Sequence, residues 1–136
     1  MIELRVCIDV DDLDKGISFY TQGLGLSLGR RFGDKAAELL GGSAPIDILA
    51  KPAGSAATAS GTALRDYRRH WTPVHLDFVV TELATAVQRA QAHGATLEQD
   101  IKEQEWGRIA ILVDPFGHGV CLLEFTGRGY DELTST

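Results

Sequence analysis

Residues 72–80, TPVHLDFVV, place a histidine two residues before an aspartate in a run that alternates like a β-strand. Because side chains alternate between the two faces of a strand, His75 and Asp77 should share one face. The opposite face would carry the apolar residues Val74, Leu76, Phe78 and Val80. An imidazole titrates near neutral pH, so His75 is a candidate general base, metal ligand or ligand contact. The alternative is a structural histidine that is hydrogen-bonded to a neighbour such as Asp77.

Arg5 is the second candidate, in the N-terminal alternating run. It should share a strand face with Cys7, because the two residues lie two positions apart. A guanidinium can clamp an anionic group of a small molecule, or it can pair with a carboxylate of the protein, for which Glu3, Asp9 and Asp47 are the candidates. Both interpretations stay open, because a clamp and a structural pair use the same residue.

The chain has two cysteines, Cys7 and Cys121, and no CxxC motif. A zinc ribbon is therefore excluded, and a disulfide scaffold is not expected. We expect both cysteines to be small buried side chains. A nucleophilic Cys121 would need a low thiol pKa and hence nearby positive charge, which Arg5 and His75 would supply if they shared its site.

The stretch RDYRRHW, residues 65–71, is the one concentrated basic and aromatic segment. It is typical of a solvated loop, but it could also border a ligand site, where Trp71 would stack on a planar group and the arginines would meet an anion. In the turn DPFGHG we expect His118 to secure the turn. We expect Glu124 on the helix-facing side or at the rim of its sheet.

The bulk composition describes one ordinary domain of 136 residues with a formal charge of −6 and a pI near 5.1. This acidity argues against nucleic acid or an anionic membrane as a partner, because both would be repelled on average. The N-terminus has no signal-peptide pattern, and the apolar runs are too short to span a membrane. We therefore expect a cytoplasmic setting.

One pattern occurs twice, at a shift of 70 residues. Residues 5–20 and 75–90 both change from a period of two to a helical period at the same place. We expect helices at about 12–23 and 82–93, with Asp11 and Thr81 at the N-cap positions, where their side chains can accept from unpaired N–H groups.

Three further strand-like segments follow each helix, so each copy reads as βαβββ. We expect an α+β fold in which two such modules form an open, barrel-like cup. The predicted boundaries are repeat 1 at about 2–52, a linker or lid loop at about 53–71, repeat 2 at about 72–125 and a C-terminal tail at 126–136.

These segments resemble the vicinal oxygen chelate superfamily, which groups glyoxalase I, bleomycin-resistance proteins, methylmalonyl-CoA epimerase and extradiol dioxygenases. The likeness rests on IDVDDLDKGISFYTQGLGL at 8–26, PVHLDFVV at 73–80 and VDPFGHGVCLLEF at 113–125. It implies paired modules whose cup binds a ligand. In metal-dependent members it also implies one metal ligand from the first and one from the last strand of each half.

At those positions this chain carries Arg5 and His75 in the first strands and Asp47 and Cys121 in the last strands. A guanidinium has no lone pair for a cation and repels it. We therefore expect no metal and no other cofactor. The alternative is a divalent metal, Zn, Ni, Fe or Mn, bound by Asp47, His75 and Cys121.

The resulting hypothesis is a glyoxalase-like or bleomycin-resistance-like protein that binds a small polar or anionic molecule in a non-standard, metal-free cup. The expected ligand contacts are Arg5, Cys7, Asp47, Trp71, His75, Asp77 and Cys121, with His75 as the candidate catalytic residue. The alternative is a metal-dependent lyase, isomerase or dioxygenase, so whether the protein is an enzyme stays open. We expect a homodimer, because a second chain can cover exposed strand faces and edges.

Overall fold

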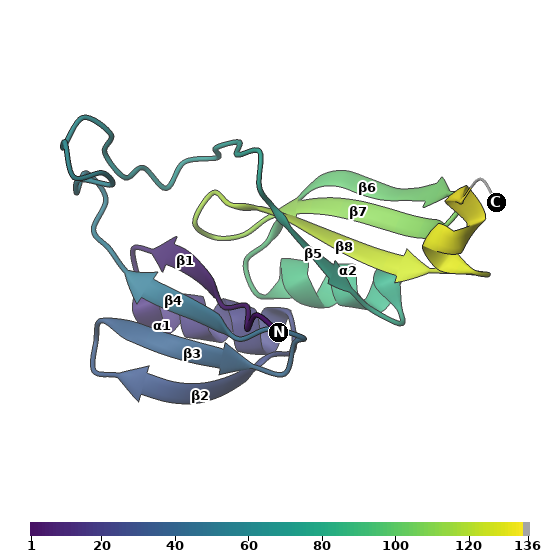
Figure 1. Ribbon diagram of the computed structural model, residues 1–136, viewed down its shortest axis with the longest axis horizontal. Coiled ribbons are helices and arrows are strands. Elements are labelled where there is room, and N and C mark those ends of the chain that lie inside the picture. The colour runs from purple at the N-terminus through teal and green to yellow at the C-terminus, as the bar shows by residue number, and fades with distance from the viewer. Residues whose placement is uncertain (135–136) are drawn as a thin grey trace. The chain divides into compact units, whose positions relative to one another are not determined.

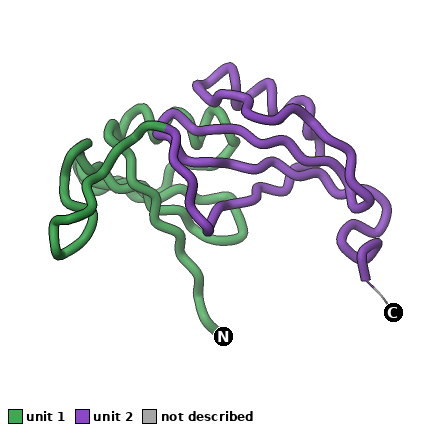
Figure 2. Tube along the Cα trace, turned by 90° about the horizontal axis from the view of Figure 1, so that it is seen from above, with its two compact units in different colours: residues 1–68 green, residues 69–136 purple. Residues whose placement is uncertain are grey.

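The structure, a computed structural model, describes residues 1–134. The chain divides into two compact units, Met1–Arg68 and Arg69–Thr136, which we call the first and the second module (Figure 2). Each module has the element order βαβββ, and each forms its own open four-stranded sheet. The expected α+β class with two βαβββ modules is thereby confirmed.

The first module contains β1 (Val6–Val10), α1 (Leu13–Ser18), a π-helical turn (Phe19–Gly23), β2 (Ser27–Phe32), β3 (Ala36–Leu40) and β4 (Ile46–Ala50). Its sheet has the order β1-β4-β3-β2, in which β1 and β4 are parallel and the other pairs are antiparallel. Helix α1 covers one face of this sheet (Figure 1). Alternation along the strands directs apolar side chains to that face, where the fully buried residues include Val10, Phe19, Tyr20, Leu39 and Ile48.

The second module repeats this arrangement with β5 (Leu76–Val79), α2 (Leu83–Ala92), β6 (Thr96–Gln104), β7 (Gly107–Val113) and β8 (Gly119–Phe125) (Figure 1). Its sheet has the order β5-β8-β7-β6, again with only the β5–β8 pair parallel. Its core contains Leu83, Leu112, Phe116, Leu122 and Leu123.

Strand register confirms the shift of 70 residues for the first strand of each copy, whereas the last strands correspond at a shift of 74 residues. Cys7 of β1 pairs with Asp47 of β4, and Asp77 of β5 pairs with Cys121 of β8. Cys7 and Asp77 are therefore equivalent positions, and so are Asp47 and Cys121.

Both helices begin one residue later than expected, so the predicted N-caps were wrong. Asp12, not Asp11, is the N-cap of α1, and its Oδ1 accepts from the backbone N–H of Lys15 at 3.0 Å. Glu82, not Thr81, is the N-cap of α2, and its side chain makes no capping hydrogen bond. An acceptor reaches the start of α2 from elsewhere in the module.

That acceptor is Glu124 on β8. Its Oε1 accepts from the backbone N–H of Leu83 at 3.2 Å, and its Oε2 accepts from Nε of Arg108 at 2.8 Å. The hydrogen bond from Arg108 is the main cause that lowers the pKa of Glu124. A carboxylate at a helix N-terminus also meets the positive end of the helix dipole. The expectation that Glu124 lies on the helix-facing side is confirmed.

Residues 53–66 do not run as an open linker within the first module. The backbone of Gly54 donates to Arg65 and that of Arg65 donates to Ser55, so the segment folds back on itself. Nε of Arg65 also donates to Oδ2 of Asp9 at 2.8 Å, which ties the base of the loop to β1. Its role as a lid stays a prediction.

The predicted C-terminal tail contains structure. Gly129–Leu133 forms a 3-10 turn, and Tyr130 makes edge-to-face contacts with Trp106 and Phe125, at ring-centroid distances of 5.3 and 4.7 Å. These aromatic contacts hold the turn against the ends of β7 and β8. Residues 135–136 of the tail lie outside the described residues. No helix within residues 1–134 is long and apolar enough to cross a bilayer.

Candidate functional site

The first module presents an arginine held by two carboxylates. Nε and Nη2 of Arg5 donate to both oxygens of Asp47, at 3.0 and 2.8 Å. Nη2 also donates to Oε2 of Glu38 at 2.7 Å. Of the alternatives left open for Arg5, the structure shows the pairing with Asp47, and it adds Glu38 as a second carboxylate that was not expected.

Glu38 lies beside Asp47 because β3 and β4 pair at these two residues. Its side chain accepts from the backbone N–H, Nε and Nη2 of Arg30, at 3.3, 3.1 and 2.8 Å. Only 6% of Glu38 is exposed. Gly29 gives its carboxylate room, since a Cβ there would lie 2.8 Å from Oε1. The signal in the sequence was a glutamate inside an apolar strand, two residues from Ala36 and Leu40.

The four side chains, Arg5, Arg30, Glu38 and Asp47, form a closed ion network whose formal charges sum to zero. Hydrogen bonds from Arg30 and then from Arg5 lower the pKa of Glu38 to about 2. The carboxylates in turn raise the pKa of Arg5, chiefly through its hydrogen bonds to Asp47. A guanidinium stands where the resemblance implies a metal ligand, and both oxygens of Asp47 bind it. These residues therefore do not fit the family's divalent ion.

This network predicts a specific loss of stability in acid. Because the pKa of Glu38 is about 2 in the folded state against an ordinary 4.5, its contribution is present above pH 4.5 and is lost as the pH falls toward 2. We expect the urea midpoint of the wild type to fall over this window more steeply than that of Glu38→Gln. Parallel curves for the two proteins would show that Glu38 titrates normally.

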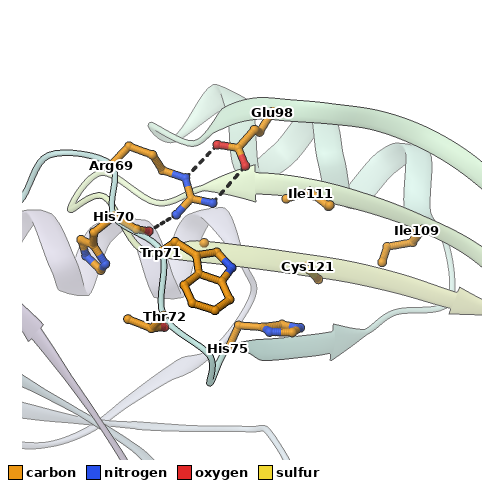
Figure 3. A pocket seen from close by; sticks show the side chains of 10 residues that line it. Arg69, His70, Trp71, Thr72, His75, Glu98, Ile109, Ile111 and Cys121 are labelled. Carbon is orange, nitrogen blue, oxygen red and sulfur yellow. Dashed lines mark hydrogen bonds and ion pairs between the residues drawn. The ribbon is translucent and has the colours of Figure 1, made fainter.

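The second module contains a pocket of about 340 Å³ (Figure 3). Its walls come from the segment that precedes β5 and from β6, β7 and β8. The lining residues are Arg69, His70, Trp71, Thr72, His75, Glu98, Ile109, Ile111, Gly119 and Cys121.

Arg69 is the cation of this pocket. Its Nε and Nη2 donate to the two oxygens of Glu98 at 2.7 and 2.9 Å, and its Nη1 donates to the carbonyl of His70 (Figure 3). A Cβ at Gly119 would lie 3.2 Å from Nη2, so the glycine lets the guanidinium approach β8. The bidentate pair aims a planar donor group along one wall of the pocket.

Aromatic and apolar side chains supply the rest of the surface. Trp71 is 79% exposed, and its indole stands in front of β8, while Ile109 and Ile111 line the pocket from β7 (Figure 3). An exposed indole beside a guanidinium can contact a planar or apolar group of a ligand whose charge binds the arginine. The expectation that residues 69–71 border a site agrees with this placement. Arg68, from the same basic segment, does not line the pocket and pairs with Asp66.

Two residues that line the pocket, His75 and Cys121, lie beside Asp77, and the three side chains are of types that can bind a metal ion. Nε2 of His75 lies 3.2 Å from Oδ1 of Asp77, which confirms the expected neighbour of the histidine. The ligating atoms of His75, Asp77 and Cys121 all lie within 4.8 Å of one another. Asp77 and Cys121 are brought together by the pairing of β5 with β8.

His75 itself precedes the strand, which begins at Leu76 and not at residue 72. Val74 is 77% exposed and does not join the buried apolar face, so that expectation was wrong. Pro73 has no N–H for a ladder, and the Thr72 hydroxyl donates to the Val74 carbonyl, so the backbone turns here instead of pairing.

The two cysteines differ in burial. Cys121 is buried, and burial, followed by the charge of Asp77, raises the pKa of its thiol to about 11. This direction is opposite to what a nucleophilic thiolate needs. Cys7 is exposed, so the expectation of a buried side chain was wrong for it. It lies on the sheet face that α1 does not cover.

The predicted site residues thus fall into two groups. Arg5 and Asp47 join in the first module, while Trp71, His75, Asp77 and Cys121 gather in the second. The shared cavity expected for Arg5, Asp47, His75 and Cys121 stays a prediction. Arg69 and His70 were expected only as part of a segment that could border a site. The residues that sequence reasoning missed are Arg30, Glu38, Thr72, Glu98, Ile109, Ile111 and Gly119.

Two βαβββ modules with ligating and ionic side chains on their sheets define a protein of the vicinal oxygen chelate type. A glyoxalase-like domain model matches residues 5–123, so the chain belongs to the glyoxalase-like domain family.

Solved structures with this fold include a glyoxalase/bleomycin resistance protein/dioxygenase family enzyme of Burkholderia phytofirmans PsJN. It is 20% identical, with 90% of this chain and 97% of that chain covered and a TM-score of 0.71. The genomically encoded fosfomycin resistance protein of Listeria monocytogenes is 18% identical over 98% of this chain and 100% of that chain, with a TM-score of 0.70. Lactoylglutathione lyase of Agrobacterium tumefaciens is 18% identical over 91% and 92%, with a TM-score of 0.63.

Uncharacterized proteins of Mycobacterium bovis and Mycobacterium tuberculosis are 42% identical over 48 residues, which is 35% of this chain. The match spans about a third of the length of these curated relatives, 32% and 28% respectively.

Proposed function

We propose that the protein binds a small anionic molecule, such as a carboxylate or a phosphonate, in the pocket of the second module. The observation that carries this proposal is the guanidinium of Arg69, which lines the pocket beside the exposed indole of Trp71. Arg69 would bind the anionic group, and Trp71 would contact the rest of the ligand. This mode of binding needs no metal ion.

The ion pair between Arg69 and Glu98 supports the proposal. It holds the Arg69 side chain in place, and a ligand anion can replace Glu98 as its partner. The side chains of Arg69 and Glu98 are 36% and 42% exposed. An exposed pair contributes only about 0.2–1 kcal/mol, so a ligand anion with the same bidentate geometry can take the place of Glu98. The carboxylate of Glu98 occupies the position that the ligand would take.

The structural relatives favour a small ligand in a general way. They include a fosfomycin resistance protein and a lactoylglutathione lyase, whose names both refer to a small molecule. Several expectations stay predictions from the sequence. They are proton transfer by His75, ligand contacts of Arg5, Asp47 and Cys7, a homodimer and a cytoplasmic setting.

Titration with phenylphosphonate tests the proposal, with tryptophan fluorescence and calorimetry as readouts. We expect binding to the wild type and at least about a tenfold loss of affinity in Arg69→Ala, which removes a charge-assisted bidentate contact. Benzyl alcohol, which lacks the anionic group, should bind weakly to both. Trp71→Phe should abolish the fluorescence change, because Trp106 lies in the aromatic cluster with Phe125 and not in the pocket.

Arg128→Ala is the matched control. Arg128 also forms an exposed carboxylate pair, with Glu132, but it does not line the pocket. Equal affinities of Arg69→Ala and Arg128→Ala for phenylphosphonate would refute the proposal.

A further inference from the structure

The apolar wall of the pocket continues along the sheet of the second module. Ile109 and Ile111 of β7 line the pocket together with Cys121 of β8 (Figure 3). Because side chains alternate along a strand, Leu123 and Phe125 follow Cys121 on the same face of the sheet. Two neighbouring strands therefore carry apolar side chains from the pocket to the end of the sheet.

Strand pairing makes these side chains direct neighbours. Ile111 pairs with Cys121, and Ile109 pairs with Leu123. On the other side of β8, Val79 of the edge strand β5 also pairs with Leu123. We call this surface the apolar strip; its residues are Val79, Ile109, Ile111, Leu123 and Phe125.

The apolar strip lies on the sheet face that α2 leaves open. Glu124, between Leu123 and Phe125 on β8, reaches the start of α2 with its carboxylate, so its two neighbours point away from the helix. Val79 is 56% exposed and Phe125 is 39% exposed. Exposed apolar side chains beside a pocket form a surface on which a ligand can lose contact with water.

Polar side chains border the apolar strip on β6. Gln99 pairs with Ile111 and Lys102 pairs with Ile109, and both polar residues are exposed. The strip is therefore limited to β5, β8 and β7, which span roughly 10 Å at about 4.8 Å between strands. The 7 residues of β8 extend over about 20 Å at roughly 3.3 Å per residue, so the strip is longer than it is wide.

The two ends of the strip differ in chemistry. At the start of β8, Gly119 lets the guanidinium of Arg69 approach the sheet. At the far end, Phe125 makes edge-to-face contacts with Trp106 and Tyr130 (Figure 1). A cationic donor group thus stands at one end of a long apolar surface, and aromatic rings stand at the other.

We propose that the ligand of the second module is a single-chain amphiphilic anion, whose charged head group binds Arg69 and whose unbranched apolar chain lies along the strip toward Phe125. This inference rests on the anion binding proposed above and adds the chemical class of the rest of the ligand. The ligand is a free molecule and not a bilayer, because a formal charge of −6 opposes approach to an anionic membrane. Each methylene that leaves water for the strip strengthens binding, so the affinity depends on chain length.

Alkylphosphonates from ethylphosphonate to octylphosphonate test this dependence, with calorimetry on the full chain at concentrations below micelle formation. Full burial of one methylene strengthens binding about fourfold, and a strip that covers one side of the chain should give about twofold per methylene. We therefore expect the dissociation constant of octylphosphonate to be at least about fiftyfold below that of ethylphosphonate. 1-Octanol, which has the chain without the charge, should bind weakly.

Val79→Thr and Ile109→Thr place a hydroxyl on the strip and keep the branched shape of the side chain. Combined, they should lower the affinity for octylphosphonate by about tenfold and that for ethylphosphonate by less, so the dependence on chain length flattens. Val74→Thr is the matched control, because Val74 is exposed in the same module but lies outside both the pocket and the strip. It should leave the dependence on chain length unchanged. Circular dichroism verifies that each variant is folded.

The outcomes separate this inference from the function on which it rests. If phenylphosphonate binds through Arg69 but octylphosphonate binds no more tightly than ethylphosphonate, the strip does not hold a chain and only this inference is wrong. A rise in affinity with chain length that the combined threonine variant leaves unchanged would also overturn it, and so would a preference for vesicles of anionic lipid over free octylphosphonate. If phenylphosphonate binding does not depend on Arg69, the proposed function is wrong, and this inference is wrong with it.

Discussion

Replacing Arg5 by histidine should give the first module an affinity for Ni²⁺ or Zn²⁺ that its wild-type form lacks. In the wild type the guanidinium binds Asp47 and Glu38 at 2.7–3.0 Å and cancels one of their charges. The variant keeps both carboxylates, removes the cation and adds an imidazole next to them. One nitrogen and two oxygens then face a single point, and we expect a gain in affinity on the order of tenfold or more.

Calorimetric titration in a Cys121→Ser background measures this gain without the three potential metal ligands of the second module. Arg5→Gln is the control, because it removes the same charge and supplies no imidazole. Since the Arg5 side chain is 43% exposed and Glu38 keeps Arg30, we expect either change to leave the protein folded. If Arg5→His binds Ni²⁺ no better than Arg5→Gln, then the two carboxylates do not converge on position 5.

The repeat in the sequence was sufficient to predict the fold and part of the first-module network. A shift of 70 residues aligned Arg5 with His75 and Cys7 with Asp77, whereas the last strands correspond at a shift of 74 residues, which aligns Asp47 with Cys121. In short regular strands, alternation is enough to predict which side chains share a face of the sheet, because successive side chains point to opposite faces. The pairing of Arg5 with Asp47 was predictable for this reason.

Arg30 on β2, which pairs with Glu38, and Glu98 on β6, which pairs with Arg69, were not predictable in this way, because both strands are irregular. The register of β2 shifts between Leu28 and Arg31, next to Arg30, and the register of β6 shifts between Leu97 and Gln99, at Glu98. A bulge moves the following side chains relative to their neighbours, so alternation alone assigns them to the wrong face. These irregular positions carry the partners of Glu38 and Arg69.

Burial was the other property that alternation did not fix. The shift of 70 makes Cys7 the counterpart of Asp77 and not of Cys121, and only Cys121 is buried. Cys7 sits on the first strand, at the edge of its sheet, whereas Cys121 sits on β8 between two neighbouring strands. The order of strands in the sheet decides such a difference, and residue spacing does not contain that order.

The turn after β7 connects the stability of the second module to its pocket. Asp114 is buried, and its Oδ1 accepts from the backbone N–H groups of Phe116 and His118 at 2.8 and 2.9 Å. The carbonyl of Gly117 in this turn accepts from the backbone N–H of His70 at 3.1 Å. The turn thereby positions the segment that carries Arg69.

Asp114→Ala should therefore destabilise the protein and weaken anion binding together. It leaves the backbone N–H groups of Phe116 and His118 without this acceptor, which costs roughly 2–6 kcal/mol at about 1–3 kcal/mol for each unsatisfied group. Asp114→Asn keeps an acceptor oxygen at the same place and should lose less than half as much. Urea unfolding measures the stability, and phenylphosphonate titration below the unfolding transition measures the pocket. If Asp114→Ala is as stable as Asp114→Asn, the turn forms without this side chain. If the affinity of Asp114→Ala for phenylphosphonate is unchanged, Glu98 and Gly119 alone position Arg69.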